Sequence, residues 1–200
     1  MARKPSGKNH SGGPAEKPEI RIRKAADRLF YEQGFEATGI NRVLDEAGAH
    51  KQSLYLHFES KEDLGRAYVQ TRGAQVMDLL RTLTRKKDPV AMVESWVQIL
   101  KRQARNQSFY GCPLANFSAQ TLSHGNSFQP VLKSMLEEWL NLLGEYFREV
   151  SKTGKLDAEP EKLARQLIMI YEGNTQLFLI TRDTVWLDRI ALDFKDLLAA

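Results

Sequence analysis

Apolar residues recur with helical spacing along almost the whole chain beyond residue 18. In the first such stretch, Ile22, Ala25, Ala26, Leu29 and Phe30 fall at i, i+3, i+4, i+7 and i+8 and form one stripe. The pattern predicts helices at about 19–33, 39–47, 51–58, 61–85, 113–122, 128–151, 161–182 and 185–199, and one more beginning at Pro89. No convincing period-2 strand appears, so we expect an all-α fold of about nine helices.

Small polar residues and glycines mark the predicted helix ends. Gly34 and Gly48 follow the first two helices, and glycine readily takes the left-handed conformation that ends a helix. Thr38, Ser60 and Asp88 precede the second, fourth and fifth helices. Because their side-chain oxygens can accept hydrogen bonds from unpaired amides, we expect them to be N-caps.

Composition excludes several classes of protein. Of the 200 residues, 42% are hydrophobic and 27% charged, which is enough for a packed core and excludes wholesale disorder. No apolar run approaches the roughly 18 residues of a membrane span, and the charged N-terminus lacks the apolar segment of a secretory signal. The single cysteine, Cys112, forbids an internal disulfide and fits a reducing compartment. We therefore expect a cytoplasmic protein without a membrane partner.

The positive charge is concentrated at the N-terminal end. Residues 1–28 hold eight basic and three acidic residues, a net +5, whereas the whole chain has a net charge of +4. Such an end favours a polyanion, either nucleic acid or an anionic membrane, although a solvated tail explains it equally well. Residues 1–18 are also rich in glycine and proline, so we expect a disordered basic tail there.

The second and third predicted helices are short and joined by a glycine-containing turn, with the first helix to support them. This spacing is typical of a helix-turn-helix, whose later helix enters the major groove, although a bundle with a short-helix corner has the same pattern. The polar side chains at its start can meet base edges, and those that follow can meet phosphates. The first group is His50, Lys51, Gln52 and Ser53, and the second is Tyr55, His57 and Lys61.

Two stretches around this unit resemble the TetR family of transcriptional regulators. They are residues 34–40 and 47–64, and the most specific part is Ser53-Leu54-Tyr55-x-His57-Phe58-x-Ser60-Lys61-Glu62. The resemblance implies a DNA-binding domain at 19–64 and an effector-binding and dimerisation domain at 65–200. It also implies a phosphate contact at Thr38 and a base contact at Asn41. Gly39 stands where Thr or Ser is common, and His50 and Gln52 replace the usual small residues, so the operator cannot be inferred from a relative.

The last two predicted helices are apolar around much of their circumference, which favours a two-fold dimer over burial in one larger core. Residues 111–120 resemble a Gly-Cys-x-x-x-Asn segment found beside the effector pocket in a subset of the family. We expect an apolar pocket for a small organic ligand, although each aromatic residue alone fits ordinary core. The expected pocket residues are Trp96, Phe109, Cys112, Asn116, Phe117, Trp139, Tyr171 and Asn174.

Together these features predict a ligand-responsive repressor. A homodimer would bind a pseudo-palindromic DNA operator and leave it when a small organic effector binds. Two alternatives remain. One is a DNA-binding protein with a nucleoid-associated or division-linked role. The other is a sensor of electrophiles or oxidants that uses Cys112: a helix N-terminus would lower the pKa of its thiol, unless the thiol is buried and inert. We expect no enzyme, cofactor or metal site, because the four histidines do not cluster with carboxylates or the cysteine at metal-ligand spacing.

Overall fold

The computed structural model describes residues 16–154 and 158–199, and within them the chain forms nine α-helices, one short 3₁₀ helix and no strand. The predicted all-α fold is therefore confirmed. The helices are α1 (Pro18–Gln33), α2 (Ile40–Ala47), α3 (Lys51–Tyr55), α4 (Lys61–Leu83), α5 (Pro89–Arg105), α6 (Pro113–Gln120), η1 (Leu122–His124), α7 (Gln129–Ser151), α8 (Pro160–Thr181) and α9 (Val185–Ala199).

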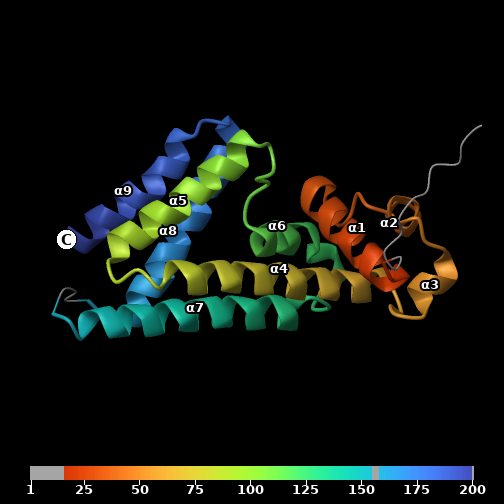
Figure 1. The fold of residues 1–200 in the computed structure, drawn as a ribbon, viewed down its shortest axis with the longest axis horizontal. Helices are drawn as coiled ribbons and strands as arrows, with labels where there is room; N and C mark the ends of the chain where they lie inside the picture. The colour runs from red at the N-terminus through yellow and green to blue at the C-terminus, as the bar shows by residue number, and fades with distance from the viewer. Residues whose placement is uncertain (1–15, 155–157, 200) are drawn as a thin grey trace, which may run out of the picture.

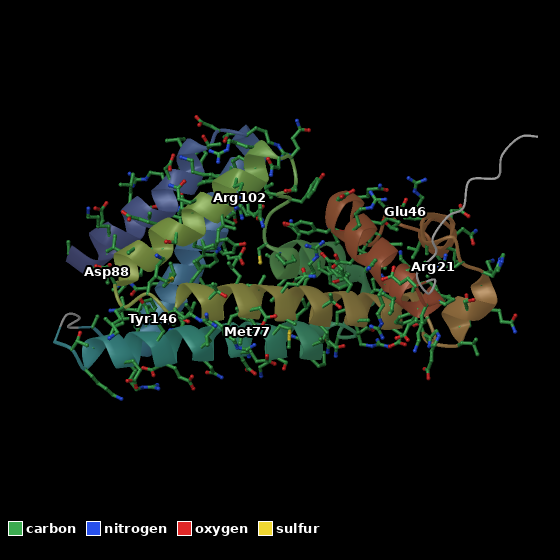
Figure 2. The ribbon with its side chains drawn as sticks, viewed as in Figure 1. Arg21, Glu46, Met77, Asp88, Arg102 and Tyr146 are labelled. Atoms are coloured by element: carbon green, nitrogen blue, oxygen red, sulfur yellow. The ribbon has the colours of Figure 1, made fainter. Side chains whose placement is uncertain are left out.

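The long helix α4 connects the two ends of an elongated molecule. Figure 1 shows α1, α2 and α3 at one end and α5, α8 and α9 towards the other, with α7 running along α4. Helix α6 lies above α4, between α1 and the far group. In Figure 2 the side chains of Arg21 and Glu46 mark the α1–α3 end, and Asp88 and Tyr146 mark the opposite one.

Two of the three predicted N-caps are confirmed. The Ser60 hydroxyl accepts a hydrogen bond from the Asp63 amide at 3.1 Å, and the Asp88 carboxylate accepts one from the Ala91 amide at 3.0 Å. The prediction for Thr38 is wrong, because Gly39 precedes α2 as its cap residue. The Thr38 side chain is buried instead, and its hydroxyl donates to the Gly34 carbonyl at 2.7 Å.

Helix α3 ends at Tyr55, three residues earlier than predicted. The amides of His57 and Phe58 both donate to the Leu54 carbonyl at 2.9 Å, which turns the chain towards α4. The apolar positions Leu54 and Phe58 still face inward, because a tightened turn keeps both near one face. Periodicity therefore identified the buried residues but not the end of the helix.

The buried ring of Phe35 joins the α1–α3 unit to the rest of the molecule. Its centroid lies 5.0 Å from that of Phe117 and 5.3 Å from that of Phe128. Helix α4 passes directly beneath, where a Cβ built on Gly65 would lie 2.7 Å from the Phe35 ring. The close approach requires glycine at this point of α4.

Helices α8 and α9 keep a second apolar face uncovered. Their inner faces bury Leu167, Phe178 and Ile190. On the outer faces Met169 is 66% exposed and Ile180 76%, with further exposed apolar side chains at Val185 and Leu192. None of the helices in residues 16–154 and 158–199 combines the length and apolar character needed to span a membrane.

The contact at Gly65 predicts an unusual response to alanine. Replacing glycine within a helix normally stabilises a protein by up to about 1 kcal/mol, and we expect this for Gly144→Ala in α7, whose new Cβ meets the Glu161 side chain at an ordinary 3.9 Å. Gly65→Ala should instead destabilise by about 1–3 kcal/mol, because its Cβ overlaps Phe35. Urea denaturation at one fixed protein concentration measures both. Equal stabilisation by the two variants would contradict close packing at the junction.

Candidate DNA interface and ligand pocket

Helices α2 and α3 meet at a tight left-handed turn. Gly48 has φ 54° and ψ 45°, and the Ala49 amide donates to the Leu44 carbonyl at 3.0 Å. Val43, Leu44 and Leu54 are buried beneath the turn against α1. The buried apolar side chains fix α3 to α1 and α2 and leave its opposite side facing solvent.

The exposed side of this unit carries most of the predicted DNA-binding residues. Asn41 on α2, and His50, Lys51 and Gln52 at the start of α3, are all exposed, while Ser53 is half-buried. His50 is the N-cap residue of α3, and its side chain makes no cap hydrogen bond, so the imidazole is not used within the helix. Tyr55 is 57% exposed. These solvent-facing polar groups are of the kinds that contact base edges and phosphates in protein–DNA complexes.

Three predicted phosphate contacts have partners or surroundings that sequence did not reveal. Thr38 is only 1% exposed, so it cannot reach a phosphate without a rearrangement. The Lys61 ammonium lies 4.3 Å from the centroid of the Phe35 ring, in a cation–π contact that holds it at the start of α4. His57 is exposed and has its Nδ1 atom 3.7 Å from a Glu19 carboxylate oxygen.

Much of the basic charge of α1 is neutralised within the protein. Arg23 pairs with Glu19 at 3.1 Å, and Arg28 pairs with Glu32 at 3.0 Å and also with Glu46. The predicted basic tail falls mostly in residues 1–15, outside the described residues. Sequence reasoning missed Arg42, an exposed cation on α2 beside Asn41. Its place one residue after Asn41, which the sequence already marked as a candidate, was the available signal.

A cavity of about 680 Å³ lies between α6, η1, α7 and α8. Its volume is in the range of small-molecule sites. Leu114 on α6, Leu132 and Leu136 on α7 and Ile168 on α8 supply apolar walls, together with the face of Trp139. The indole nitrogen of Trp139 already donates to the Gly73 carbonyl at 3.3 Å. We call this cavity the α6–α8 pocket.

The structure does not bring the eight predicted pocket residues together. Among them only Trp139 borders the α6–α8 pocket. Trp96, Phe109 and Tyr171 border a separate cavity of about 130 Å³ beside α4, where the Trp96 and Tyr171 rings stack with centroids 4.6 Å apart. The prediction of one shared cavity is therefore wrong, because neighbouring turns of α8 face different partners.

The remaining predicted pocket residues have structural contacts. Phe117 points from α6 towards Phe35 rather than into the pocket. Asn174 is buried and donates to an Asp193 carboxylate oxygen on α9 at 3.0 Å. Asn116 donates to the Tyr110 carbonyl and accepts from the Gln176 amide group at 3.3 Å, so it fixes the loop before α6.

Cys112 is fully buried at the start of α6 and is not activated. Burial first, and then the negative charge of Glu172, raise the pKa of its thiol well above the ordinary value. The expectation of a lowered pKa at a helix N-terminus is wrong here, because desolvation of a thiolate outweighs the backbone amides that favour it. Burial also raises the pKa of Glu172, and this effect exceeds the opposite effect of the neighbouring Cys112 thiol, which lowers that pKa.

Helix α6 contacts both the pocket and the α1–α3 unit. Its Leu114 and Ser118 border the α6–α8 pocket, while the side-chain Oε1 atom of its Gln120 accepts a hydrogen bond from the Phe35 amide at 2.7 Å. Just before α6, the Gly111 carbonyl accepts a hydrogen bond from the Tyr31 hydroxyl at 2.8 Å. Among the described residues, no three His, Cys, Asp or Glu side chains are grouped as metal ligands.

Further contacts connect the α1–α3 unit to the helices on either side of α6. The imidazole of His124 in η1 lies 2.5 Å from a Glu36 carboxylate oxygen. On α4, Arg72 pairs with Asp27 of α1 at 2.7 Å and lies over the Tyr31 ring at 4.1 Å. A displacement of α6 or η1 would therefore act directly on the end of α1 and the loop after it.

Both the N-terminal helices and the C-terminal helices of this chain match families of known proteins. Residues 22–68 match the family model described as bacterial regulatory proteins, tetR family, and residues 90–193 match a model described as tetracyclin repressor-like, C-terminal domain. The chain is 28% identical over 166 residues to the HTH-type transcriptional regulator YxaF of Bacillus subtilis, covering 82% of this chain and 85% of that protein. It is 26% identical over 187 residues to LmrA of the same organism, covering 89% and 95%.

A solved structure has the same fold. The regulatory protein TetR from Rhodobacter sphaeroides superposes with a TM-score of 0.80, at 22% identity, covering 90% of this chain and 97% of that one.

The burial of Cys112 predicts that its thiol reacts slowly with alkylating reagents in the folded protein. A thiol reagent such as iodoacetamide at about pH 8 should modify the folded protein far more slowly than the chain unfolded in guanidinium, because the thiolate is the nucleophile and both burial and the raised pKa suppress it. Mass spectrometry of timed samples measures the two rates, with Cys112→Ser as the blank. A folded protein modified as fast as the unfolded chain would contradict this packing.

Proposed function

Because this chain belongs to the tetR family of bacterial regulatory proteins, transcriptional regulators that bind DNA operators and act as dimers, we propose that it is a ligand-responsive repressor. It binds a pseudo-palindromic operator and leaves it when a small organic molecule occupies the α6–α8 pocket. Residues 19–64 form the DNA-binding domain and residues 65–200 the effector-binding and dimerisation domain. It acts in the cytoplasm, where the bacterial chromosome lies.

One observation supports this proposal most strongly: α6 borders the pocket on one side and the end of α1 on the other. A ligand that moves Leu114 or Ser118 also moves Gln120, which bonds to the Phe35 amide. Release requires only that the ligand binds more tightly to the conformation that fits DNA poorly, which is a population shift. The tetracyclin repressor-like description of the matched C-terminal domain favours repression over activation.

The outer faces of α8 and α9 are the proposed dimer interface. Exposed Met169, Ile180 and Leu192 would leave water when a second copy packs against them about a two-fold axis. In such a dimer the two α3 helices would meet successive turns of the major groove, roughly 34–36 Å apart. At each site, His50, Lys51 and Gln52 would read base edges, while Tyr55 and Lys61 would contact phosphates.

Two alternatives are distinguished by different observations. A nucleoid-associated or division-linked DNA-binding protein would use the same α3 surface but occupy many scattered chromosomal sites rather than one or a few promoters. A sensor acting through Cys112 is disfavoured by the full burial and raised pKa of the thiol. Membership of the subset with a Gly-Cys-x-x-x-Asn segment stays a prediction.

Selection of bound DNA from a random pool tests the proposal and supplies an operator. We expect an inverted repeat whose half-sites are about one helical turn apart. Lys51→Ala or Gln52→Ala should then weaken preference for particular base pairs by about 1–3 kcal/mol, measured by fluorescence anisotropy on the selected operator and its point variants.

Lys87→Ala is the matched control, because Lys87 is an exposed cation in the loop between α4 and α5. The next residue, Asp88, lies at the opposite end of the molecule from the α1–α3 unit (Figure 2). It should bind the operator as the parent does. Lys61→Ala should weaken binding to all sequences and reduce the salt dependence by about one unit of slope. A pool without any enriched motif, or α3 variants that discriminate as the parent does, would contradict the assignment.

A further inference from the structure

The lining of the α6–α8 pocket holds one acidic side chain, that of Glu172. Glu172 projects from α8 and borders the pocket opposite α7. Among the described residues, its Oε2 atom is buried and has no hydrogen-bond partner. The Cys112 thiol lowers the pKa of this carboxyl group, but a thiol is only a weak hydrogen-bond donor. The carboxyl group of Glu172, on the pocket lining, therefore has one buried oxygen whose hydrogen-bonding demand the described residues do not meet.

The one basic residue on the pocket lining does not neutralise this carboxyl group. Lys133 lies on α7, its side chain is 72% exposed, and it pairs with Glu137 at 3.6 Å. The other polar lining groups are neutral hydroxyl and amide side chains: Ser118, Thr121, Asn126 and Gln129. The titratable groups beside Glu172 are the Cys112 thiol and the Tyr171 phenol, and neither supplies positive charge.

We propose that the effector is an aromatic or aliphatic cation, an organic ammonium or amidinium, whose charged group bonds to Glu172 while its apolar body lies against Trp139, Leu132 and Leu136. The inference rests on the proposed function, because it assigns the ligand class of the same pocket. An uncompensated carboxylate in an apolar site is costly, and a cation at hydrogen-bond distance removes that cost. A neutral ligand of equal shape could offer the carboxylate only an uncharged hydrogen bond, which is weaker and leaves its negative charge uncompensated.

Proton release gives this proposal a second, independent signature. Burial raises the pKa of Glu172 in the ligand-free protein. A bound cation favours the ionised carboxylate and lowers that pKa, so binding should release a proton. Affinity for a permanently charged ligand should accordingly rise as the pH rises through the titration range of the ligand-free carboxyl group, and level off above it.

Isothermal titration calorimetry with three isosteric probes tests the inference. The probes are 1-naphthylmethylammonium, 1-naphthylmethanol and 1-naphthoate. The ammonium should bind about ten- to a hundredfold more tightly than the alcohol, as a charge-assisted hydrogen bond would give, and the anion should bind most weakly. In Glu172→Gln the preference for the ammonium should vanish, whereas Glu145→Gln, at an exposed position on α7, should keep it.

Two further measurements separate the possible failures. Titration of the wild-type protein over a series of pH values, in buffers of different ionisation enthalpy, measures proton release without any variant. No release at any pH, or proton uptake, overturns the inference. If the alcohol binds as tightly as the ammonium, and the pocket-filling Leu136→Trp abolishes both, the pocket is a ligand site and only the charge assignment is wrong. If none of the probes binds, or binding survives Leu136→Trp, the inference and the effector pocket of the proposed function fail together.

Discussion

The contact of Phe35 with α6 and α4 is the interaction on which the rest of the molecule depends. Phe35 lies in the loop between α1 and α2, yet its ring packs on Phe117 and Phe128 and its amide donates to the Gln120 side chain. Gly65 lets α4 pass close enough to complete the contact. The α1–α3 unit therefore packs directly on the helices that enclose the α6–α8 pocket. Through these contacts, a ligand in the pocket would change the position of α3.

Helix positions follow closely from the sequence because local signals determine them. The apolar stripes, the caps Ser60 and Asp88 and the turn at Gly48 act over one or two helical turns, and the observed helices begin within a residue of the predicted positions. Thr38 shows the limit of a local rule. Its hydroxyl has a closer partner in the Gly34 carbonyl, and the backbone of Gly39 takes the cap position without any side chain.

The pocket was less predictable because it depends on which helices meet. The stripe on α7 contains Leu132 and Leu136, but only packing decides that this first half borders a cavity while Leu143 and Phe147 are buried in the core. Likewise Asn174 and Glu172 are close in sequence, yet one faces α9 and the other the pocket. The exposed residues of α3 needed no such information, because the motif itself fixes which side faces away from the core.

Rigid coupling between the α1–α3 unit and the pocket helices is the central claim, and hydrogen exchange in increasing urea measures it most directly. Mass spectrometry would compare peptides from α1–α3 with peptides from α7 and α8. If the contacts of Phe35 unite the α1–α3 unit with the pocket helices, the most protected amides of both should exchange through one shared unfolding reaction. Its free energy and its urea dependence should then be the same for both groups of peptides. Exchange of α1–α3 through a separate opening of much lower free energy, while α7 and α8 stay protected, would contradict the account.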